Sequence, residues 1–364
     1  MAAETGTLKI KNFKSIRDIE ITTSRVNIFF GKPNSGKSNL LEALTLFNVI
    51  QSKAQQQLQA PIIRYNTLDN LFYDRDVSND ISVRYNDDSA LLTYYPSANT
   101  YIQLVNPTTE FLKKKKALFE QGDSIININK KEPILSSGLS SSGYNSFLAL
   151  LNQEGQESNV IGNHHSLENP IRKYEFKEGL SYSDTFRAYL KPTGENLFTI
   201  VQGNPKIKEF IAAFFEEFNL EFLIDFSSKK FEIQKKEKGI VYKIPFELTP
   251  DTLRRMLFYI SAIYSNSNAT ILLEEPESHS FPPYIKELSD LIKEDSGNKY
   301  FITTHSPYFI NSMIEDSLKY EDIAFFHVYY EDYQTKIRRL GQNDLDILWN
   351  SSADIFFNID ALNR

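Results

Sequence analysis

The clearest chemical motif of the chain is a glycine-rich loop that follows a short apolar run. Its eight residues are Gly31, Lys32, Pro33, Asn34, Ser35, Gly36, Lys37 and Ser38. They match the pattern G-x-x-x-x-G-K-[ST], in which backbone N–H groups surround phosphates, the lysine contacts the β- and γ-phosphates and the hydroxyl ligates Mg²⁺. A chance match in a Gly/Ser-rich turn is the alternative. The apolar run before the loop and the helical pattern after it favour a site for ATP and Mg²⁺.

Two adjacent carboxylates follow another apolar run in the C-terminal third, in the segment ATILLEEPESH (residues 269–279). The C-terminal end of a buried strand is where open α/β sheets bind their ligands. We therefore expect Glu274 to hold Mg²⁺, directly or through water, and Glu275 to orient and deprotonate the attacking water. A solvated acidic turn after a core strand is the alternative, and the phosphate loop favours the site.

A third apolar run, in YFITTHSP (residues 300–307), ends at a histidine. At the end of a neighbouring strand, His305 could contact the γ-phosphate or the attacking water. The alternative is a capping turn, in which Ser306 caps a helix with Pro307 at its first position. Both interpretations can hold together, because the cap uses Ser306 and leaves His305 free.

Hydrophobic periodicity predicts the elements that position these groups. Strands are expected at Leu8–Ile10, Ile19–Ile21, Val26–Phe30, Ile81–Tyr85, Leu91–Tyr95, Tyr101–Val105, Phe222–Asp225, Phe231–Gln234, Thr270–Leu273, Tyr300–Thr303, Ala324–Tyr330 and Lys336–Leu340. Helices are expected at Ser38–Val49, Ile207–Phe218, Pro250–Tyr264 (with Thr249 as N-cap) and Pro283–Lys293, from Pro307 onward, and at the end of the chain. The alternation of strands and helices predicts a parallel sheet covered on both faces.

The arrangement of these elements predicts an α/β fold in three parts. Residues 1–105 form an N-terminal lobe with the phosphate loop and a small antiparallel sheet, and residues 241–364 form a C-terminal lobe with the acidic strand end. Residues 106–240 form an inserted, partly helical subdomain, and residues 106–180 within it read as an insertion with flexible connections.

Together these motifs resemble the ABC-type ATPase heads of the RecF, SMC and OLD-like group. The resemblance is carried by LKIKNFKSIRDIEI, GKPNSGKSNLLEAL, LLEEPESHSFP and TTHSP, and it covers residues 7–50 and 245–310. It is greatest to stand-alone prokaryotic "AAA family" ATPases related to OLD proteins. The resemblance implies a P-loop NTPase fold with a mixed or parallel core sheet, a switch histidine at His305, and nucleotide contacts from Lys14 and Asn39. A surface role for Lys14 is the alternative.

Such heads dimerise around ATP, so the resemblance implies a homodimer or higher oligomer in which the signature segment of one head contacts the γ-phosphate on the other. Here that segment is residues 247–252, and Thr249 supplies the hydroxyl. Pro250 removes an N–H donor and Asp251 would repel the phosphate, so slow turnover is expected. Residues 278–280 correspond to the D-loop at the dimer interface, and Asp69 and Asn70 are weak candidates for the Q-loop.

Composition narrows the class of protein. The chain has no cysteine, a net charge of −7 and no apolar run long enough for a membrane span. We expect a cytoplasmic protein with no membrane partner, and the acidic balance argues weakly against bulk DNA binding. The pair His164-His165 and the run of lysines at 113–116 read as solvent-exposed, although metal and phosphate-backbone contacts are the respective alternatives.

The expected function is that of a nucleotide-gated regulatory ATPase. Only about 60 residues follow His305, which leaves no room for the nuclease domain of OLD proteins. The effector is therefore expected to be a separate protein, in prokaryotic anti-phage defence. A RecF-like, DNA-binding repair ATPase and an ATP sensor with little turnover are the alternatives.

Overall fold

The computed structural model describes residues 5–48, 63–109, 112–113, 146–163, 170–179, 182–183, 187–315, 322–351, 356 and 359. Its strands are β1 (Gly6–Phe13), β2 (Ile16–Thr23), β3 (Val26–Phe30), β4 (Ile81–Tyr85), β5 (Asp88–Tyr95), β6 (Thr100–Val105), β7 (Ser146–Leu151), β8 (Glu157–Asn163), β9 (Ile171–Tyr174), β10 (Glu221–Asp225), β11 (Lys230–Glu237), β12 (Ile240–Pro245), β13 (Thr270–Glu274), β14 (Lys299–Thr304), β15 (Ile323–Glu331) and β16 (Gln334–Arg339). Its α-helices are α1 (Lys37–Leu44), α5 (Leu197–Gly203), α6 (Pro205–Glu216), α7 (Asp251–Ser265), α8 (Pro282–Glu294), α9 (Pro307–Glu315) and α10 (Gln342–Ser351).

The core is a six-stranded sheet with the order β16-β15-β3-β14-β13-β9. All its neighbouring strands run parallel except the β15–β16 hairpin. The strand that leads into the phosphate loop therefore lies beside β14, which separates it from the acidic strand β13. Because parallel strands present their carboxyl ends at one edge, the loop, the carboxylates and His305 are gathered at that edge.

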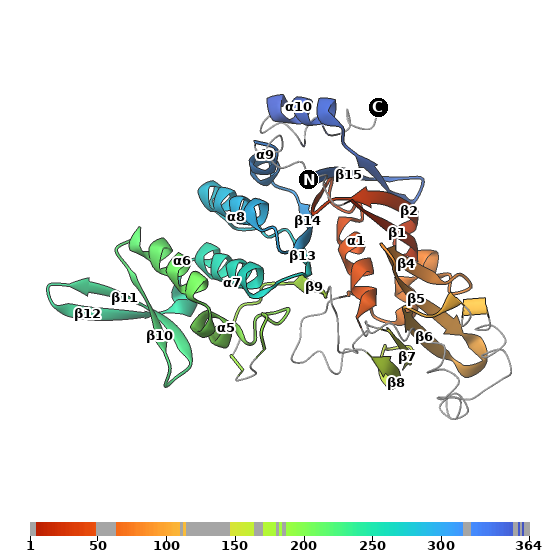
Figure 1. Cartoon of the computed structure of the whole chain (residues 1–364), viewed down its shortest axis with the longest axis horizontal. Coiled ribbons are helices and arrows are strands. Elements are labelled where there is room, and N and C mark those ends of the chain that lie inside the picture. The colour runs from red at the N-terminus through yellow and green to blue at the C-terminus, as the bar shows by residue number, and fades with distance from the viewer. Residues whose placement is uncertain are drawn as a thin grey trace.

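Each face of the core sheet is covered by a different layer (Figure 1). Val26, Ile28 and Phe30 of β3 pack on the same side as the apolar residues of α7, α8 and α9. Phe29 points to the opposite side, where it packs with Leu40 and other α1 residues and with β1. The near-continuous apolar composition of β3 follows from this burial on both faces.

The second sheet is antiparallel and has seven strands in the order β2-β1-β4-β5-β6-β7-β8. Its last two strands, together with β9 of the core sheet, lie within residues 106–180, which the sequence predicted to be an insertion with flexible connections. That prediction is wrong for these strands. Strand β7 lacks a polar–apolar alternation because Phe147 and Ala149 face one hydrophobic cluster while Leu148 and Leu150 face another.

A third, three-stranded sheet (β10-β11-β12) projects from the helical layer at one end of the molecule (Figure 1). The first two of its strands were predicted, and β12 was not. The proposed division of the chain at residues 105 and 240 stays a prediction. In the pairing of strands, however, β7 and β8 join the sheet of the first lobe, and β9 joins the core sheet.

Most elements predicted in residues 1–105 and 241–364 form with small shifts at their ends, and the predicted fold class is confirmed. The first helix is shorter than the expected Ser38–Val49, because α1 ends at Leu44 and a 3₁₀ turn, η1 (Thr45–Phe47), follows it. The hydroxyl of Thr45 donates to the carbonyl of Glu42 at 2.6 Å, which favours this tightened end. No helix in the described part of the chain is long and apolar enough to cross a membrane.

The predicted cap of α7 is wrong, whereas the predicted cap of α9 forms. Pro250 occupies the N-cap position of α7, and the Thr249 hydroxyl donates instead to the carbonyl of Phe246 at 2.7 Å. The backbone N–H of Phe309 donates to the Ser306 hydroxyl at 3.3 Å, as expected for a cap before Pro307. Because the cap uses the hydroxyl of Ser306, the side chain of His305 is not needed for it and can contribute to the site.

Candidate active site

The phosphate loop connects β3 to α1, and close neighbours of its glycines leave little room for a side chain. Gly36 adopts φ +95°, a conformation that disfavours other residues, and a Cβ atom there would lie 2.0 Å from Thr335 Oγ1. A Cβ atom at Gly31 would lie 2.0 Å from the carbonyl oxygen of Val328. Lys32, Pro33 and Asn34 are exposed at the tip. The close packing behind the glycines keeps the loop backbone available for phosphate oxygens.

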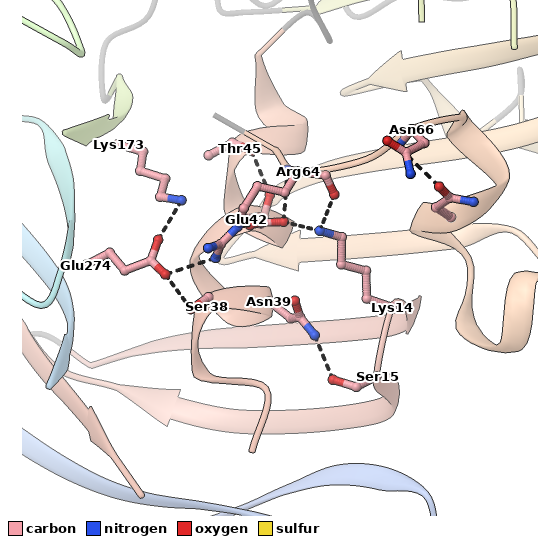
Figure 2. Close-up of polar contacts among 11 residues, drawn as sticks. Lys14, Ser15, Ser38, Asn39, Glu42, Thr45, Arg64, Asn66, Lys173 and Glu274 are labelled. Carbon is pink, nitrogen blue, oxygen red and sulfur yellow. Dashed lines mark hydrogen bonds and ion pairs between the residues drawn. The ribbon is translucent and has the colours of Figure 1, made fainter. Parts of the chain in front are cut away.

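The β15–β16 hairpin, from the C-terminal part of the chain, supports the loop from behind. Thr335 Oγ1 donates to the carbonyl of Ser35 at 3.0 Å, and the N–H of Thr335 donates to the carbonyl of Ser15 at 2.8 Å. Asn39 Nδ2 donates to Ser15 Oγ at 2.7 Å (Figure 2). The Asn39 side chain is therefore directed to the turn between β1 and β2, and its contact with nucleotide stays a prediction.

Lys37 folds back over the loop. Its Nζ atom donates to the carbonyl oxygens of Gly31 at 3.1 Å and Lys32 at 2.8 Å. Burial lowers the pKa of Lys37 to about 8, although Glu275 and Glu274 act in the opposite direction. The Lys37 ammonium is thus held over the loop by neutral carbonyls, which β- and γ-phosphates would replace with full negative charges.

The metal-binding pair expected from the sequence is in direct contact. Ser38 Oγ donates a short hydrogen bond to Glu274 Oε1, although the two residues are 236 positions apart in the chain (Figure 2). A hydroxyl and a carboxylate are the hard oxygen ligands that Mg²⁺ prefers. With the phosphate loop beside them, these residues fit Mg²⁺ bound together with nucleotide phosphates, a mode that needs few protein ligands.

Two further cations lie at the Glu274 carboxylate, and neither was identified from the sequence. Lys173 Nζ, on β9, lies 2.9 Å from Glu274 Oε2, and Arg64 Nη2 lies 2.9 Å from Glu274 Oε1 (Figure 2). Desolvation would raise the pKa of Glu274, but Lys173, the Ser38 hydrogen bond and Arg64 outweigh it and hold the pKa at about 2. The carboxylate is therefore ionised at every pH at which the protein would work.

Behind these groups, α1 carries a fully buried carboxylate, Glu42. It pairs with Lys14 through a short contact, and its Oε1 atom lies 2.7 Å from Arg64 Nε (Figure 2). Lys14 Nζ also donates to the carbonyl of Arg64 at 2.6 Å. The Lys14 ammonium therefore already has two partners, the Glu42 carboxylate and the Arg64 carbonyl. Its predicted contact with nucleotide stays a prediction.

The expected catalytic pair forms at the ends of β13 and β14. His305 Nε2 lies 3.3 Å from Glu275 Oε1, and both side chains are partly exposed. The backbone of Glu275 has φ +45°, an uncommon conformation for a residue with a side chain. Burial and the nearby Lys37 lower the pKa of His305, against the attraction of Glu275. An imidazole beside a carboxylate can share with it the orientation of one water molecule.

A buried acid, Glu277, connects the two strand ends. Its Oε1 atom accepts hydrogen bonds from Thr304 Oγ1 at 2.5 Å and from the N–H of His305 at 3.3 Å. Only 6% of Glu277 is exposed, and its Oε2 atom has no hydrogen-bond partner within the described residues. Burial raises its pKa to about 7, against the hydrogen bonds from Thr304 and His305. The carboxyl holds the backbone that presents His305.

The raised pKa of Glu277 predicts a specific pH dependence of stability. The folded state binds the Glu277 proton more tightly than the unfolded chain, so this stabilisation is complete below pH about 4.5 and is lost as the pH rises to about 7. Urea unfolding from pH 4.5 to pH 8 should show a shallower loss of unfolding free energy in Glu277→Gln than in the wild type. The surface variant Glu315→Gln is the control, and equal slopes in Glu277→Gln and wild type would contradict the assignment.

Polar side chains of the signature-like segment, residues 247–252, contact other groups of this chain. The Thr249 side chain is buried and its hydroxyl donates within its own turn, so the predicted contact with a nucleotide on a second subunit stays a prediction. Asp251 is paired with Arg255 at 2.7 Å, which reduces the repulsion that we expected it to exert on phosphate. Thr252 Oγ1 donates to the carbonyl of His279 at 2.7 Å, which ties this segment to the D-loop.

The other weak candidates do not join the site in the described residues. Asp69 pairs with Arg75, and Asn70 caps its own 3₁₀ turn, η3 (Leu68–Leu71). His164-His165 and the lysines at 114–116 lie outside the residues that the structure describes. Within those residues, no group of three or more His, Cys, Asp or Glu side chains could hold a metal ion. A metal here would therefore rely on Ser38, Glu274 and nucleotide phosphates.

The residues missed by sequence reasoning share one property: their partners are distant in the chain. The only available signal was an isolated carboxylate, Glu42, among the leucines of α1. Lys173 lies on a short strand that was not predicted, and Arg64 and Thr335 lie in segments without a motif. Their roles follow from the strand order and from the packing of the β15–β16 hairpin against the loop.

Comparison with known proteins gives a matching family model and related sequences. The family model described as "AAA domain, putative AbiEii toxin, Type IV TA system" matches residues 69–311, about two thirds of the chain. An "ATP/GTP phosphatase" of Helicobacter pylori is 24% identical over 362 residues and is covered over 92% of its length by 93% of this chain. An uncharacterised protein of Methanocaldococcus jannaschii is 33% identical over 107 residues, 26% of this chain and 48% of its own.

Solved structures similar to this chain include SMC heads. The SMC head domain from Thermotoga maritima has a TM-score of 0.40 and 13% identity, covering 93% of this chain and 99% of its own. An SMC head bound to the C-terminal winged-helix domain of ScpA has a TM-score of 0.46 and 13% identity, covering 93% of this chain and 98% of its own. Both TM-scores lie below 0.5.

Proposed function

This chain belongs to the AAA-domain family whose model matches residues 69–311, and on this premise we propose that it binds ATP with Mg²⁺ and hydrolyses it at the site around Lys37 and Glu275. The fold supports this proposal, because the phosphate loop follows β3 and the acidic strand β13 lies one strand away, beyond β14. A relative named "ATP/GTP phosphatase" that aligns with nearly the whole chain supports this reaction.

One observation carries the proposal: residues from three distant segments converge at one edge of the core sheet. Ser38 contacts Glu274, and Glu275 lies 3.3 Å from His305. Ser38 lies in the helix that follows the phosphate loop. Glu274 ends a buried parallel strand, and Glu275 and His305 each directly follow one. A solvated acidic turn would not bring a carboxylate into contact with the hydroxyl of a phosphate loop.

The proposed roles follow from what each side chain can do. Lys37 and the loop N–H groups bind and orient the phosphates, and bound Mg²⁺ would supply charge neutralisation at Ser38 and Glu274. Glu275 accepts the proton of the attacking water, and His305 holds the same water or the γ-phosphate. Glu277 fixes the backbone at His305 through its hydrogen bond to the His305 N–H.

The test of this function is phosphate release from ATP by the full chain, with and without Mg²⁺. We expect turnover of ATP, and GTP should be measured in parallel because the Helicobacter pylori relative is named for both nucleotides. Binding of ATP without phosphate release would replace the proposal by a nucleotide sensor. Failure to bind either nucleotide would refute it.

We further propose that a second head completes the site. Exposed apolar side chains lie in or beside the segments that the resemblance assigns to a dimer face: Leu248, which is 73% exposed, lies in the signature-like segment, and Phe281 directly follows residues 278–280. Tyr308 is exposed three residues after His305. Exposed large apolar side chains of this kind are a feature of protein interfaces. Mass measurement in solution, with and without ATP, tests the assembly, and a monomer in both conditions would contradict it.

The biological role that we propose is control of a separate effector by this ATPase. The family description refers to a toxin–antitoxin system, which requires a second protein, and defence against phage is the setting we favour. Purification of the chain together with its genomic neighbours should recover a bound partner whose release depends on ATP. Recovery of the chain alone would count against this role. Recovery of bound DNA that is released as the salt concentration rises would favour a repair ATPase.

A further inference from the structure

We propose that Lys173 is a permanent cation of the nucleotide site. It supplies at Glu274 part of the positive charge that the phosphates require, and it thereby lowers the dependence of ATP binding on Mg²⁺. This inference rests on the proposed function, because it concerns how the same site binds its nucleotide. It adds a residue that no motif of the chain points to.

The position of Lys173 is set by β9, the edge strand beside β13. Lys173 pairs in register with Leu272, two residues before Glu274. Ile171 belongs to the hydrophobic cluster around α1, and Lys173 shares its strand face because side chains alternate along a strand. Tyr174 faces the opposite, helical layer. The Lys173 side chain is therefore directed toward the first turn of α1, which contains Ser38, the last residue of the phosphate loop.

Burial gives this lysine its significance. Only 3% of the Lys173 side chain is exposed, compared with 24% for Glu274 and 57% for Arg64. A buried ammonium is costly to desolvate unless a counter-charge compensates for it. Lys173 has this compensation from Glu274 Oε2 at 2.9 Å, whereas Arg64 contacts the other oxygen from the rim. Arg64 thus borders the solvent, whereas the Lys173 side chain is almost completely enclosed.

Both oxygens of the expected metal ligand are thus already contacted by protein cations. A divalent ion bound by Ser38 and Glu274 would share the carboxylate with Lys173, and two positive charges beside one carboxylate repel each other. The same charge attracts the phosphates. Lys173 should therefore weaken the site's affinity for Mg²⁺ while it strengthens metal-free binding of ATP. A lysine that only stabilises the fold would change neither quantity.

The experiment is an equilibrium titration of the full chain with a fluorescent ATP analogue, in EDTA and over a series of Mg²⁺ concentrations. In Lys173→Met, we expect metal-free binding to weaken by about tenfold, equivalent to about 1.4 kcal/mol. The Mg²⁺ concentration for half-maximal binding should fall by a similar factor. Lys173→Arg, which keeps the charge, should remain close to wild type. Thermal melting of each variant without nucleotide reports on folding separately.

Two further variants keep the test decisive. Lys293→Met removes another buried lysine, which pairs with Asp290 at 2.7 Å on α8, and it should leave the Mg²⁺ dependence unchanged. Arg64→Met removes a side chain that is 57% exposed, and Lys14 still pairs with the buried Glu42, so this variant should fold even if Lys173→Met does not. It should also lower the half-maximal Mg²⁺ concentration, because Glu274 then loses one competing cation.

The outcomes separate this inference from the proposed function. Wild type that binds ATP with the same Mg²⁺ dependence as both Lys173→Met and Arg64→Met would overturn the inference and leave the ATPase proposal standing. If Lys173→Met is unfolded, an unchanged Mg²⁺ dependence in Arg64→Met is sufficient to overturn the inference, and the ATPase proposal still stands. Wild type that does not bind ATP under any condition would overturn both.

Discussion

Replacement of Glu275 by glutamine is expected to lower the rate of ATP hydrolysis by about 10²–10⁴-fold while ATP binding is retained. The glutamine side chain keeps the size and one acceptor oxygen of glutamate but cannot take a proton from water. Glu275 lies at the end of β13, next to His305, and its side chain is accessible from the site. Neither Lys37 nor the loop backbone depends on it for position.

The measurement is single-turnover phosphate release, combined with ATP binding and with mass in solution. In Glu275→Gln, ATP that is bound but not hydrolysed should accumulate, and a dimer closed around ATP should become the main species. Glu315→Gln, which alters a surface pair with Lys286, is the matched control and should match wild type in all three measurements. Equal turnover in Glu275→Gln and wild type would remove Glu275 from the mechanism.

Replacement of Lys37 by alanine is expected to weaken the binding of ATP itself, by tenfold or more. The Lys37 ammonium folds over the loop and contacts the carbonyls of Gly31 and Lys32, the position from which it would meet β- and γ-phosphates. A charge-assisted hydrogen bond to phosphate contributes about twice as much as a neutral one. Loss of this hydrogen bond removes an attraction that is present only in the bound state, so the affinity for ATP itself falls, whatever the effect on the rate of hydrolysis.

Isothermal titration with ATP·Mg²⁺ measures this effect, and Lys11→Ala is the control. Lys11 is a half-exposed lysine of β1 that pairs with Asp18, away from the phosphate loop. Because the pKa of Lys37 is about 8 in the nucleotide-free protein, binding above this pH should be accompanied by proton uptake. An unchanged affinity in Lys37→Ala would mean that the nucleotide binds elsewhere.

The sequence by itself determined the ATPase head and the edge of the sheet that carries its site. Local patterns were sufficient for this, because each motif sits at the end of its own apolar run. Phe30 precedes the phosphate loop, Leu273 precedes the carboxylates, and Thr304 precedes the histidine. The order of the parallel strands then brings these ends together. The family match over residues 69–311 supports the recognition of an ATPase head, whereas the likeness to the RecF and SMC group and to OLD proteins stays a prediction.

Sequence patterns were insufficient where a strand is buried on both faces and where a capping hydroxyl has a second acceptor nearby. The alternation expected of a half-buried strand is absent from β7, because both of its faces pack in hydrophobic clusters. The predicted cap at Thr249 failed because its hydroxyl donates to Phe246 in the preceding turn. The clusters that cover β7 come from distant parts of the chain, whereas the contact at Thr249 is local and competes directly with the cap.

Only the tertiary structure decided the electrostatics of the site. Arg64, Lys173 and Glu42 belong to separate segments, and no spacing between them predicts that they meet. The strand order places β9 beside β13, and the packing of α1 against the core sheet brings Glu42 to Lys14 and Arg64. Charges interact through space, not along the chain, so the cations that neutralise Glu274 become visible only when the sheet is assembled.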